Sequence, residues 1–354
     1  MSGRAAGCAA VLLAGLMLGV AAGPARAAGY HLVRRIPMPQ ISGWDYLTLD
    51  GHARRLYLSN NSGVVVVNAD TLREVGTVPS PADWPGVGLV HGIATSDRLG
   101  LGFITREIPS SIVTFRLANL RVLRSSPTDA GSDGIVYDPV TERVFAFNGK
   151  HPGIHDATAV DGRSGRVVGR IELPGIPEAA VADGHGSLYV NIASTSELAR
   201  IDARALKVVR VTAMGACRHP SALGIDRARG RLFAACDNRI LVMISARTGG
   251  VLASVPTGDG TDAVAFDPGT REVLASNGEG SLTVAREVGT DRLQVLQQVK
   301  TAPGARTMAL DPRTHRVFLL TARFGSPPQH RSKFNPHGYP VAKPGSARLL
   351  VFAP

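Results

Sequence analysis

The chain has 354 residues, of which 44% are hydrophobic and 19% are charged, and its formal net charge is +11. This composition fits an ordinary globular protein that can bury a large core, and it excludes a chain too polar to fold. The basic residues are scattered through turns and form no block or stripe interleaved with aromatic residues. They therefore indicate a solvated surface, and we expect no nucleic-acid partner.

Residues 1–27 have the features of a secretory signal peptide. An Ala-, Leu- and Gly-rich run over residues 5–22 follows a basic start, and Ala25 to Ala27 supply small residues for cleavage. The alternative is an uncleaved membrane anchor, which the weakly apolar run and Pro24 disfavour. No other apolar run is long enough to cross a membrane. We expect the mature chain, residues 28–354, to lie in the periplasm or to be secreted, without a transmembrane segment.

A β-hairpin pattern repeats through the rest of the chain. Its first copy pairs Asp45–Asp50 with Arg55–Asn60, two short apolar runs of period two joined by a polar turn. Similar hairpins follow about every 43 residues, which is the spacing typical of propeller blades. In most copies the first run ends in Asp, which caps the turn behind it. The aligned starts of the first run are Asp45, His91, Asp133, Glu178, Ser221, Asp262 and Arg306.

Two further short apolar runs follow the hairpin in most units, as at Val64–Asn68 and Thr71–Gly76. Four antiparallel strands in each unit predict an all-β chain in which residues 28–354 form a single seven-bladed β-propeller. The last unit has no fourth run of its own, while Tyr30–Ile36 resembles the outer runs of the other units. We therefore expect the N-terminal strand to pair in the last blade and to close the ring, which removes its open edges.

Several short motifs recur at equivalent places in the units. They are Gly43-Trp44-Asp45-Tyr46, Val90-His91-Gly92-Ile93-Ala94, Asp133-Gly134-Ile135-Val136-Tyr137-Asp138, Leu188-Tyr189-Val190-Asn191, Ser276-Asn277-Gly278-Glu279-Gly280 and Ala305-Arg306-Thr307-Met308-Ala309-Leu310-Asp311. Through these motifs the chain resembles a known family, the exported bacterial YVTN-type β-propeller repeat proteins, also called the YncE-like family. The resemblance covers about residues 30–354. The resemblance is specific for the fold. It implies no particular reaction, since many such proteins have none assigned and a fold does not fix a function.

The resemblance implies that the first strand of each blade lines a central channel and begins at one of its mouths. The aligned starts would then form a ring around the opening, in which carboxylates converge. A ring of ionisable groups predicts a binding site, whereas the alternative is that these groups are only solvated. Trp44 lies beside the ring and would form an apolar wall. The predicted ligand-binding residues are Trp44, Asp45, His91, Asp133, Glu178, Ser221, Asp262 and Arg306.

The ends of the second strands should reach the same mouth, where Asn60, Asn148 and Asn277 are in register. Their amide oxygens, together with the ring carboxylates, are ligands suited to calcium or magnesium. Equally, Asn before Gly is a turn signal that needs no ligand. Crowded carboxylates require a bound cation, pairing with Arg306 and His91, or raised pKa values. The candidate Ca²⁺ ligands are Asp45, Asn148, Glu178, Asp262 and Asn277.

Two cysteines remain after removal of the leader, and an exported chain favours a disulfide between Cys217 and Cys236. A metal-binding or catalytic thiol pair is the alternative. His151 and His155, in a loop of the third unit, are a weaker transition-metal candidate, against two surface histidines. The long Pro- and Gly-rich stretch over residues 321–346 predicts a loop that interrupts the last blade on the mouth side.

These features support two readings of function. The first is a cell-envelope protein, expected to be a monomer, that binds a small molecule or an envelope protein through the channel mouth and has no assigned reaction. The second is a calcium-dependent hydrolase resembling the propeller lactonases, with Asp45, Glu178 and Asp262 as metal or acid–base groups. No nucleophile motif is recognisable, so no catalytic residue is assigned and the first reading is favoured.

Overall fold

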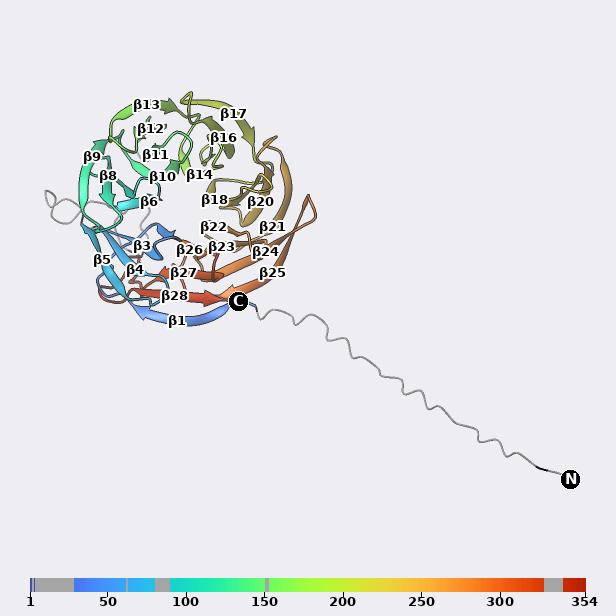
Figure 1. The fold of residues 1–354 in the computed structure, drawn as a ribbon. Helices are drawn as coiled ribbons and strands as arrows, with labels where there is room; N and C mark the ends of the chain where they lie inside the picture. Colours follow the sequence, from blue (N-terminus) through green and yellow to red (C-terminus); the bar gives the residue numbers. More distant parts are fainter. Residues whose placement is uncertain (2, 4–28, 62, 80–89, 150–152, 328–339) are drawn as a thin grey trace.

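The computed structural model describes residues 1, 3, 29–61, 63–79, 90–149, 153–327 and 340–354. Within these ranges the chain forms 28 strands, β1 to β28, and no helix. The strands make four-stranded antiparallel sheets that stand as seven blades in a ring around a central channel (Figure 1). The predicted all-β, seven-bladed propeller is therefore confirmed. The predicted signal peptide falls almost entirely outside the described residues, among which no helix could cross a membrane.

We number the blades along the chain by their innermost strands. Blade one contains β2 (Leu47–Asp50), β3 (Arg55–Asn60), β4 (Gly63–Asn68) and β5 (Glu74–Pro79), and blade two contains β6 (Val90–Ser96), β7 (Leu101–Arg106), β8 (Ser111–Arg116) and β9 (Val122–Pro127). Blade three contains β10 (Ser132–Asp138), β11 (Arg143–Asn148), β12 (Asp156–Asp161) and β13 (Val167–Glu172), and blade four contains β14 (Pro177–Ala182), β15 (Ser187–Ile192), β16 (Glu197–Asp202) and β17 (Lys207–Ala213). Blade five contains β18 (Pro220–Asp226), β19 (Arg231–Cys236), β20 (Ile240–Ser245) and β21 (Val251–Pro256), and blade six contains β22 (Thr261–Asp267), β23 (Glu272–Asn277), β24 (Ser281–Val288) and β25 (Arg292–Lys300). Blade seven contains β26 (Met308–Asp311), β27 (Arg316–Thr321), β28 (Arg348–Ala353) and β1 (His31–Pro37).

The core lies between neighbouring blades, which pack face to face. The second and third strands of each blade are therefore almost wholly buried. The sequences of β11 and β15, for example, are nearly continuous apolar runs. Outer strands face solvent on one side and alternate, as β17 does. An aromatic residue recurs at one place of the second strand, and Tyr57, Phe145, Phe233 and Phe318 are completely buried there. Burying each such side chain contributes roughly 1.5–3 kcal/mol.

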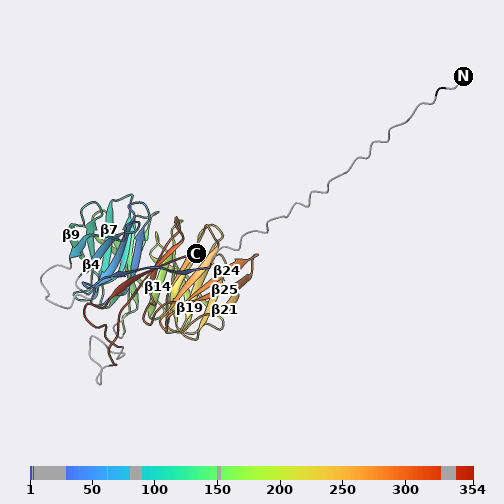
Figure 2. The ribbon, with the colours of Figure 1, turned by 90° about the horizontal axis from the view of Figure 1, so that it is seen from below.

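The ring closes through the N-terminal strand. β1 pairs antiparallel with β28, with Ile36 opposite Leu349, so the last blade has the order β1-β28-β27-β26. The first and last coloured segments of the described chain thus lie side by side at the rim (Figure 1). Seen from the side, the strands of the blades run between the two faces of the ring (Figure 2). The expected closure is confirmed.

The innermost strands begin irregularly in five of the blades. In blades two to six the pairing register of this strand shifts near its start, which is a β-bulge or similar irregularity. In blades one and seven regular pairing starts later, at Leu47 and Met308. The sequence-based strand starts at Asp45 and Arg306 are therefore wrong by two residues. Both residues lie in the entrance loop, because the backbone there leaves the ladder before it reaches the mouth.

Candidate functional site at the channel mouth

The predicted ring residues occupy equivalent positions in the propeller. Asp45 and Arg306 lie two residues before β2 and β26, and the remaining members occupy the second position of their strands. The register shifts near these positions in blades two to six. A bulge interrupts the alternation of side chains along a strand and so changes the direction of the side chain beside it. All members lie at the same end of the innermost strands. The strand-internal members are His91, Asp133, Glu178, Ser221 and Asp262.

His91 is the centre of the tightest group in the mouth. Its Nδ1 atom lies 2.7 Å from Oδ2 of Asp45 and 3.4 Å from Oδ1 of Asp133. Its Nε2 atom lies 3.1 Å from Oε2 of Glu107, which follows the end of β7. The His91 side chain is only 9% exposed, whereas those of Asp45 and Asp133 are 22% and 18% exposed. Blades one and three thus each contribute a carboxylate, blade two contributes His91 and Glu107, and the group can still be reached from solvent.

Arg306 and Asp262 form an ion pair elsewhere in the ring. Nε of Arg306 lies 3.1 Å from Oδ2 of Asp262, and the two side chains are 42% and 26% exposed. Solvent screens a pair of this exposure, so its contribution to stability is about 0–1 kcal/mol. The crowding of the ring carboxylates is therefore relieved at least partly by pairing with His91 and Arg306. The pair of Arg306 and Asp262 keeps charged atoms near solvent, where an anionic ligand can replace the carboxylate.

Tyr46 places a phenol among these charges. Burial raises the pKa of its hydroxyl well above the ordinary value, and the negative charges of Asp133, Asp45, Glu178 and Asp262 raise it further. The hydroxyl therefore stays protonated and remains a hydrogen-bond donor. The sequence motif contained Tyr46, but alternation along the strand gave no sign that it faces the ring.

Glycines next to the ring allow the innermost strands to approach one another. A Cβ atom on Gly92 would lie 2.8 Å from the carbonyl oxygen of Asp133 and 2.8 Å from Cγ2 of Ile135. Since real Cβ atoms do not come this close to backbone, a side chain at Gly92 would push blades two and three apart. Thr105 adds a hydrogen bond between the same blades, because its hydroxyl donates to the carbonyl of Asp133. The separation of His91 and Asp133 is therefore set by backbone packing.

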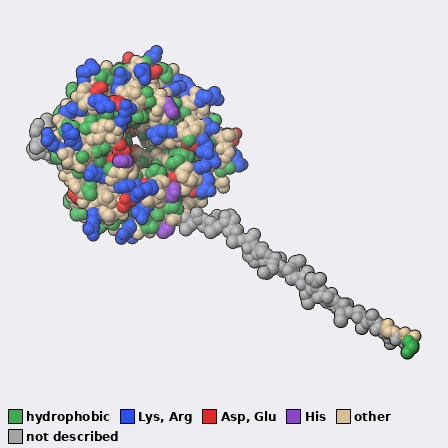
Figure 3. All heavy atoms as spheres, in the orientation of Figure 1, with side chains coloured by type: hydrophobic (Ala, Val, Ile, Leu, Met, Phe, Trp, Pro, Cys, Tyr) green, Lys and Arg blue, Asp and Glu red, His purple; other side chains and the backbone are tan. Residues whose placement is uncertain are grey.

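A cavity of about 160 Å³ is lined by residues of the innermost strands. Most of its lining residues are apolar, and Tyr46, Asp262 and Thr307 are its polar members. The space-filling view shows a central hollow with acidic and histidine side chains beside it, while Lys and Arg side chains are spread over the surrounding face (Figure 3). Apolar walls with a few convergent polar groups are the usual make-up of a ligand site. The apolar lining includes Leu47, Ile135, Leu223, Val264 and Met308.

Asn148 and Asn277, which were predicted as calcium ligands, use their amides inside their own blades. Both residues are completely buried. Nδ2 of Asn148 donates to Oδ1 of Asp156 at 2.6 Å, and the Thr261 hydroxyl donates to Oδ1 of Asn277 at 2.6 Å. Among the residues that the structure describes, the acidic members of the calcium set form no group with oxygens within 4.8 Å of one another; the group of that kind is Asp45, His91 and Asp133.

Two further ring predictions receive specific contacts. The hydroxyl of Ser221 donates to the carbonyl of Thr261 in the next blade at 2.6 Å, so it ties blade five to blade six. The Trp44 ring lies 6.2 Å from that of Phe324, centroid to centroid, and also packs against the core between blades seven and one. Phe324 belongs to the predicted loop 321–346, of which residues 328–339 lie outside the described residues, as does His151.

The predicted disulfide joins Cys217 to Cys236, with their Cα atoms 5.5 Å apart. Both cysteines are buried. The bond links the entrance loop of blade five to the end of β19, on the mouth side. A disulfide points to an oxidising environment of the kind that exported proteins meet.

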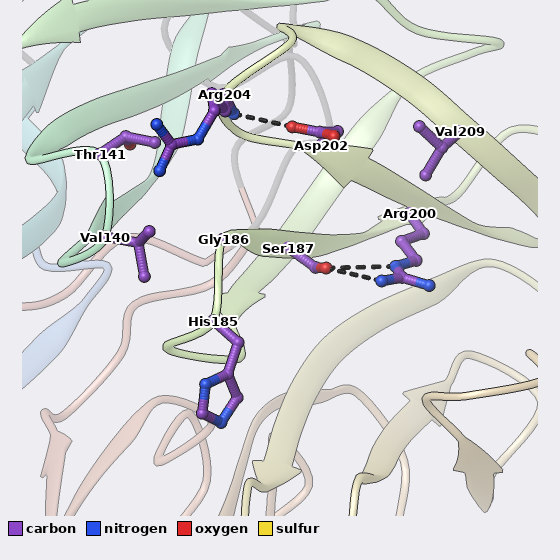
Figure 4. Close-up of a pocket in the computed structure, with 9 residues that line it drawn as sticks. All are labelled: Val140, Thr141, His185, Gly186, Ser187, Arg200, Asp202, Arg204 and Val209. Atoms are coloured by element: carbon purple, nitrogen blue, oxygen red, sulfur yellow. Dashed lines mark hydrogen bonds between the residues drawn. The ribbon is translucent and has the colours of Figure 1, made fainter.

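A second pocket, of about 270 Å³, lies between blades three and four at the end of the propeller opposite the mouth. Nη2 and Nε of Arg200 donate to the Ser187 hydroxyl at 2.9 and 3.2 Å, and the Arg204 backbone donates to Asp202 at 2.9 Å (Figure 4). His185 lies apart from these groups at the edge of the pocket (Figure 4). The pocket is larger than the channel cavity, but its polar side chains do not converge on one point. We therefore place the candidate site at the mouth.

Comparisons with known proteins define the class through the fold. No model of a protein family matches the chain, and no curated protein matches it either. Among solved structures, a chain of a mitotic checkpoint complex is 13% identical with a TM-score of 0.71, over 88% of this chain and 95% of that one. U3-55K is 11% identical with a TM-score of 0.71, over 93% and 99% of the two chains. Hydrazine synthase of Kuenenia stuttgartiensis is 13% identical with a TM-score of 0.66, over 79% and 92%. The protein is thus a β-propeller, and identities this low show the fold alone.

Proposed function

We propose that this chain is an exported, YncE-like YVTN-repeat propeller of the cell envelope, and that it binds a small molecule or a protein partner through its channel mouth. The observation that carries the proposal is the convergence of ring side chains on one opening, above all the group around His91. The disulfide supports an exported protein. The recurring motifs support the family, since they fall on equivalent strands of successive blades.

The chemistry of the mouth restricts the ligand. Arg306 offers a half-exposed guanidinium to an anionic group, and Tyr46 offers a hydroxyl that remains a donor. The apolar cavity of about 160 Å³ accepts only a small hydrocarbon portion. We therefore expect a ligand with a polar or charged head at the rim and a short apolar part directed into the channel, or a protein side chain with the same features.

A thermal-shift screen of small carboxylates, phosphates and amines tests this proposal. A ligand of the mouth should raise the melting temperature of the wild-type protein and of Arg204→Ala, which alters the opposite pocket. The same ligand should produce a much smaller shift with Arg306→Ala or Tyr46→Phe. Ligands that stabilise the mouth variants as well as the wild type, but not Arg204→Ala, would place binding in the opposite pocket and contradict the proposal.

A calcium-dependent hydrolase is the second candidate. The proximity of an imidazole to two carboxylates favours a hydrolytic reaction, because such groups can transfer protons. Lactone hydrolysis measured with and without calcium decides the matter. Activity that Asp262→Ala or Glu178→Ala abolishes, while both variants keep the wild-type circular dichroism spectrum, would establish the hydrolase. Equal rates with and without the protein would exclude it for the lactones tested.

A further inference from the structure

The contacts of His91 pose an electrostatic problem. Its two ring nitrogens face carboxylate oxygens, Nε2 facing Glu107 and Nδ1 facing Asp45 and Asp133. A neutral imidazole has one N–H donor and one lone pair. If Nε2–H donates to Glu107, the lone pair of Nδ1 faces an oxygen of Asp45 at 2.7 Å, and the two repel. A proton shared between Nδ1 and Asp45 relieves this repulsion, and so does a cation bound by both groups.

The donor set on the Nδ1 side is that of a metal site. One nitrogen and two carboxylate oxygens, from Asp45, His91 and Asp133, lie within 4.8 Å of one another. The Oδ1 atom of Asp133 lies 3.4 Å from Nδ1 of His91, so both carboxylates approach the same ring nitrogen. A mixed nitrogen and oxygen set suits zinc and neighbouring transition metals, whereas calcium takes oxygen ligands.

Glu107 supplies an independent feature of such sites. Histidines that bind metals regularly donate their second ring N–H to a carboxylate, which fixes the tautomer and the orientation of the ring. Glu107 takes this place at 3.1 Å from Nε2, on the side of the ring away from Asp45 and Asp133. It comes from the loop after β7, so it is not a ring position. This arrangement leaves Nδ1 as the atom that points at the two carboxylates.

We propose that Asp45, Nδ1 of His91 and Asp133 bind a divalent transition-metal ion of the zinc class, with Glu107 as the residue that positions the imidazole. Three protein ligands leave coordination positions for exchangeable ligands, as in open zinc sites. Because the carboxylates are partly exposed, these positions face the mouth. The inference rests on the proposed function of the mouth, and it assigns the ligand a metal-coordinating head group such as a carboxylate or phosphate.

Zinc and cobalt titrations of the untagged, metal-stripped chain test the inference. Calorimetry with Zn²⁺ should show one saturable site per chain, and Co²⁺ should produce visible absorption bands that Zn²⁺ removes. His91→Gln and Asp133→Asn should weaken Zn²⁺ binding by at least about 100-fold, and Glu107→Gln by about 10–100-fold. Ca²⁺ should not compete. His185→Gln, an exposed histidine at the opposite end, should bind Zn²⁺ as the wild type does.

Two results would overturn the metal site: no saturable Zn²⁺ binding to the wild type, or equal binding to wild type and His91→Gln. The cluster would then be an ion-pair network around a doubly protonated imidazole. A double variant of His151 and His155 to Gln is the control for the other candidate histidines, and it should bind Zn²⁺ as the wild type does. If metal binding fails while Arg306→Ala still abolishes the ligand shifts, the proposed function stands and only the metal site is wrong.

Discussion

At the scale of single residues, the contacts of His91 with Asp45, Asp133 and Glu107 bring together side chains from three blades. The aligned starts predicted His91, Asp45 and Asp133 at one mouth, because equivalent positions of a repeat occupy equivalent places in space. Glu107 could not be predicted this way, since it lies in a loop outside the repeat pattern. The hydrogen bond from Asn148 to Asp156 could not be predicted either. Strand register shows which end of a strand a residue occupies, but it does not show where the side-chain amide points.

Gly92→Ala should destabilise the protein and disturb the mouth. The added methyl group would lie 2.8 Å from the backbone of Asp133, and overpacking of this kind costs about 1–3 kcal/mol. Gly134→Ala is the matched control, because its Cβ would meet the backbone of Glu178 at 3.3 Å, where a small shift suffices. Urea unfolding of both variants measures the difference. Equal stability of the two would show that the blades are not in close contact at Gly92.

Asp156→Asn should stabilise the protein at neutral pH. Burial and the neighbouring Asp129 raise the pKa of Asp156 to about 6, although Asn148 donates a hydrogen bond to it. The protonated form of Asp156 therefore stabilises the folded protein fully below about pH 4. This contribution is lost as the pH rises through about 6. Since solvent screens this half-buried group, we expect a gain of about 1 kcal/mol at pH 7.

Thermal unfolding of wild type and Asp156→Asn between pH 4 and pH 8 checks this prediction. The two melting curves should approach one another at pH 4, where Asp156 is protonated in the folded protein. A variant that is less stable than the wild type at pH 7 would contradict it.

At the scale of elements, the strands were predictable and their starts were not. Period-two runs that end in Asp located β10, β22 and β26 in order, since these signals are local. The bulges at the mouth depend on contacts with the next blade, so they leave no pattern in the strand itself. Regular pairing in β2 and β26 thus begins two residues later than the repeat alignment indicated.

Removal of β1 should leave blade seven with an open edge. A chain that begins at residue 38 loses the pairing of Ile36 with Leu349 and the buried Tyr30. We expect the melting temperature to fall by about 5–10 °C, and the exposed β28 to promote aggregation. Differential scanning calorimetry and light scattering, with a chain beginning at residue 28 as control, measure both effects. Unchanged stability would mean that β1 does not close the ring.

At the scale of the whole molecule, the first and last blades are joined by charge as well as by strand pairing. Nη1 of Arg54 donates to Oδ1 of Asp311 at 2.9 Å, and Asp311 is only 1% exposed. Burial alone would raise the pKa of Asp311, but hydrogen bonds from Arg54 and Thr314 outweigh it and lower the pKa to about 2. The repeat predicted Asp311 as a turn residue, and it could not predict a partner that is far away in the sequence.

Arg54→Met should therefore loosen the ring. It leaves the buried carboxylate of Asp311 without its main partner, which costs about 3 kcal/mol. Because the pKa of Asp311 is depressed in the folded wild type, its contribution is present above about pH 4 and is lost as the pH falls toward 2. The difference between wild type and Arg54→Met in urea unfolding should shrink over that range. Arg313→Met, whose side chain is 61% exposed, should cost less than about 1 kcal/mol.

The metal site around His91 is the central claim, and a crystal structure of the zinc-soaked protein tests it most directly. Anomalous scattering at the zinc edge should show a peak about 2.0–2.2 Å from Nδ1 of His91 and from one oxygen each of Asp45 and Asp133. The same soak of His91→Gln should show no peak there. Zinc bound only at other sites of the wild-type protein, with the mouth unchanged, would contradict the account.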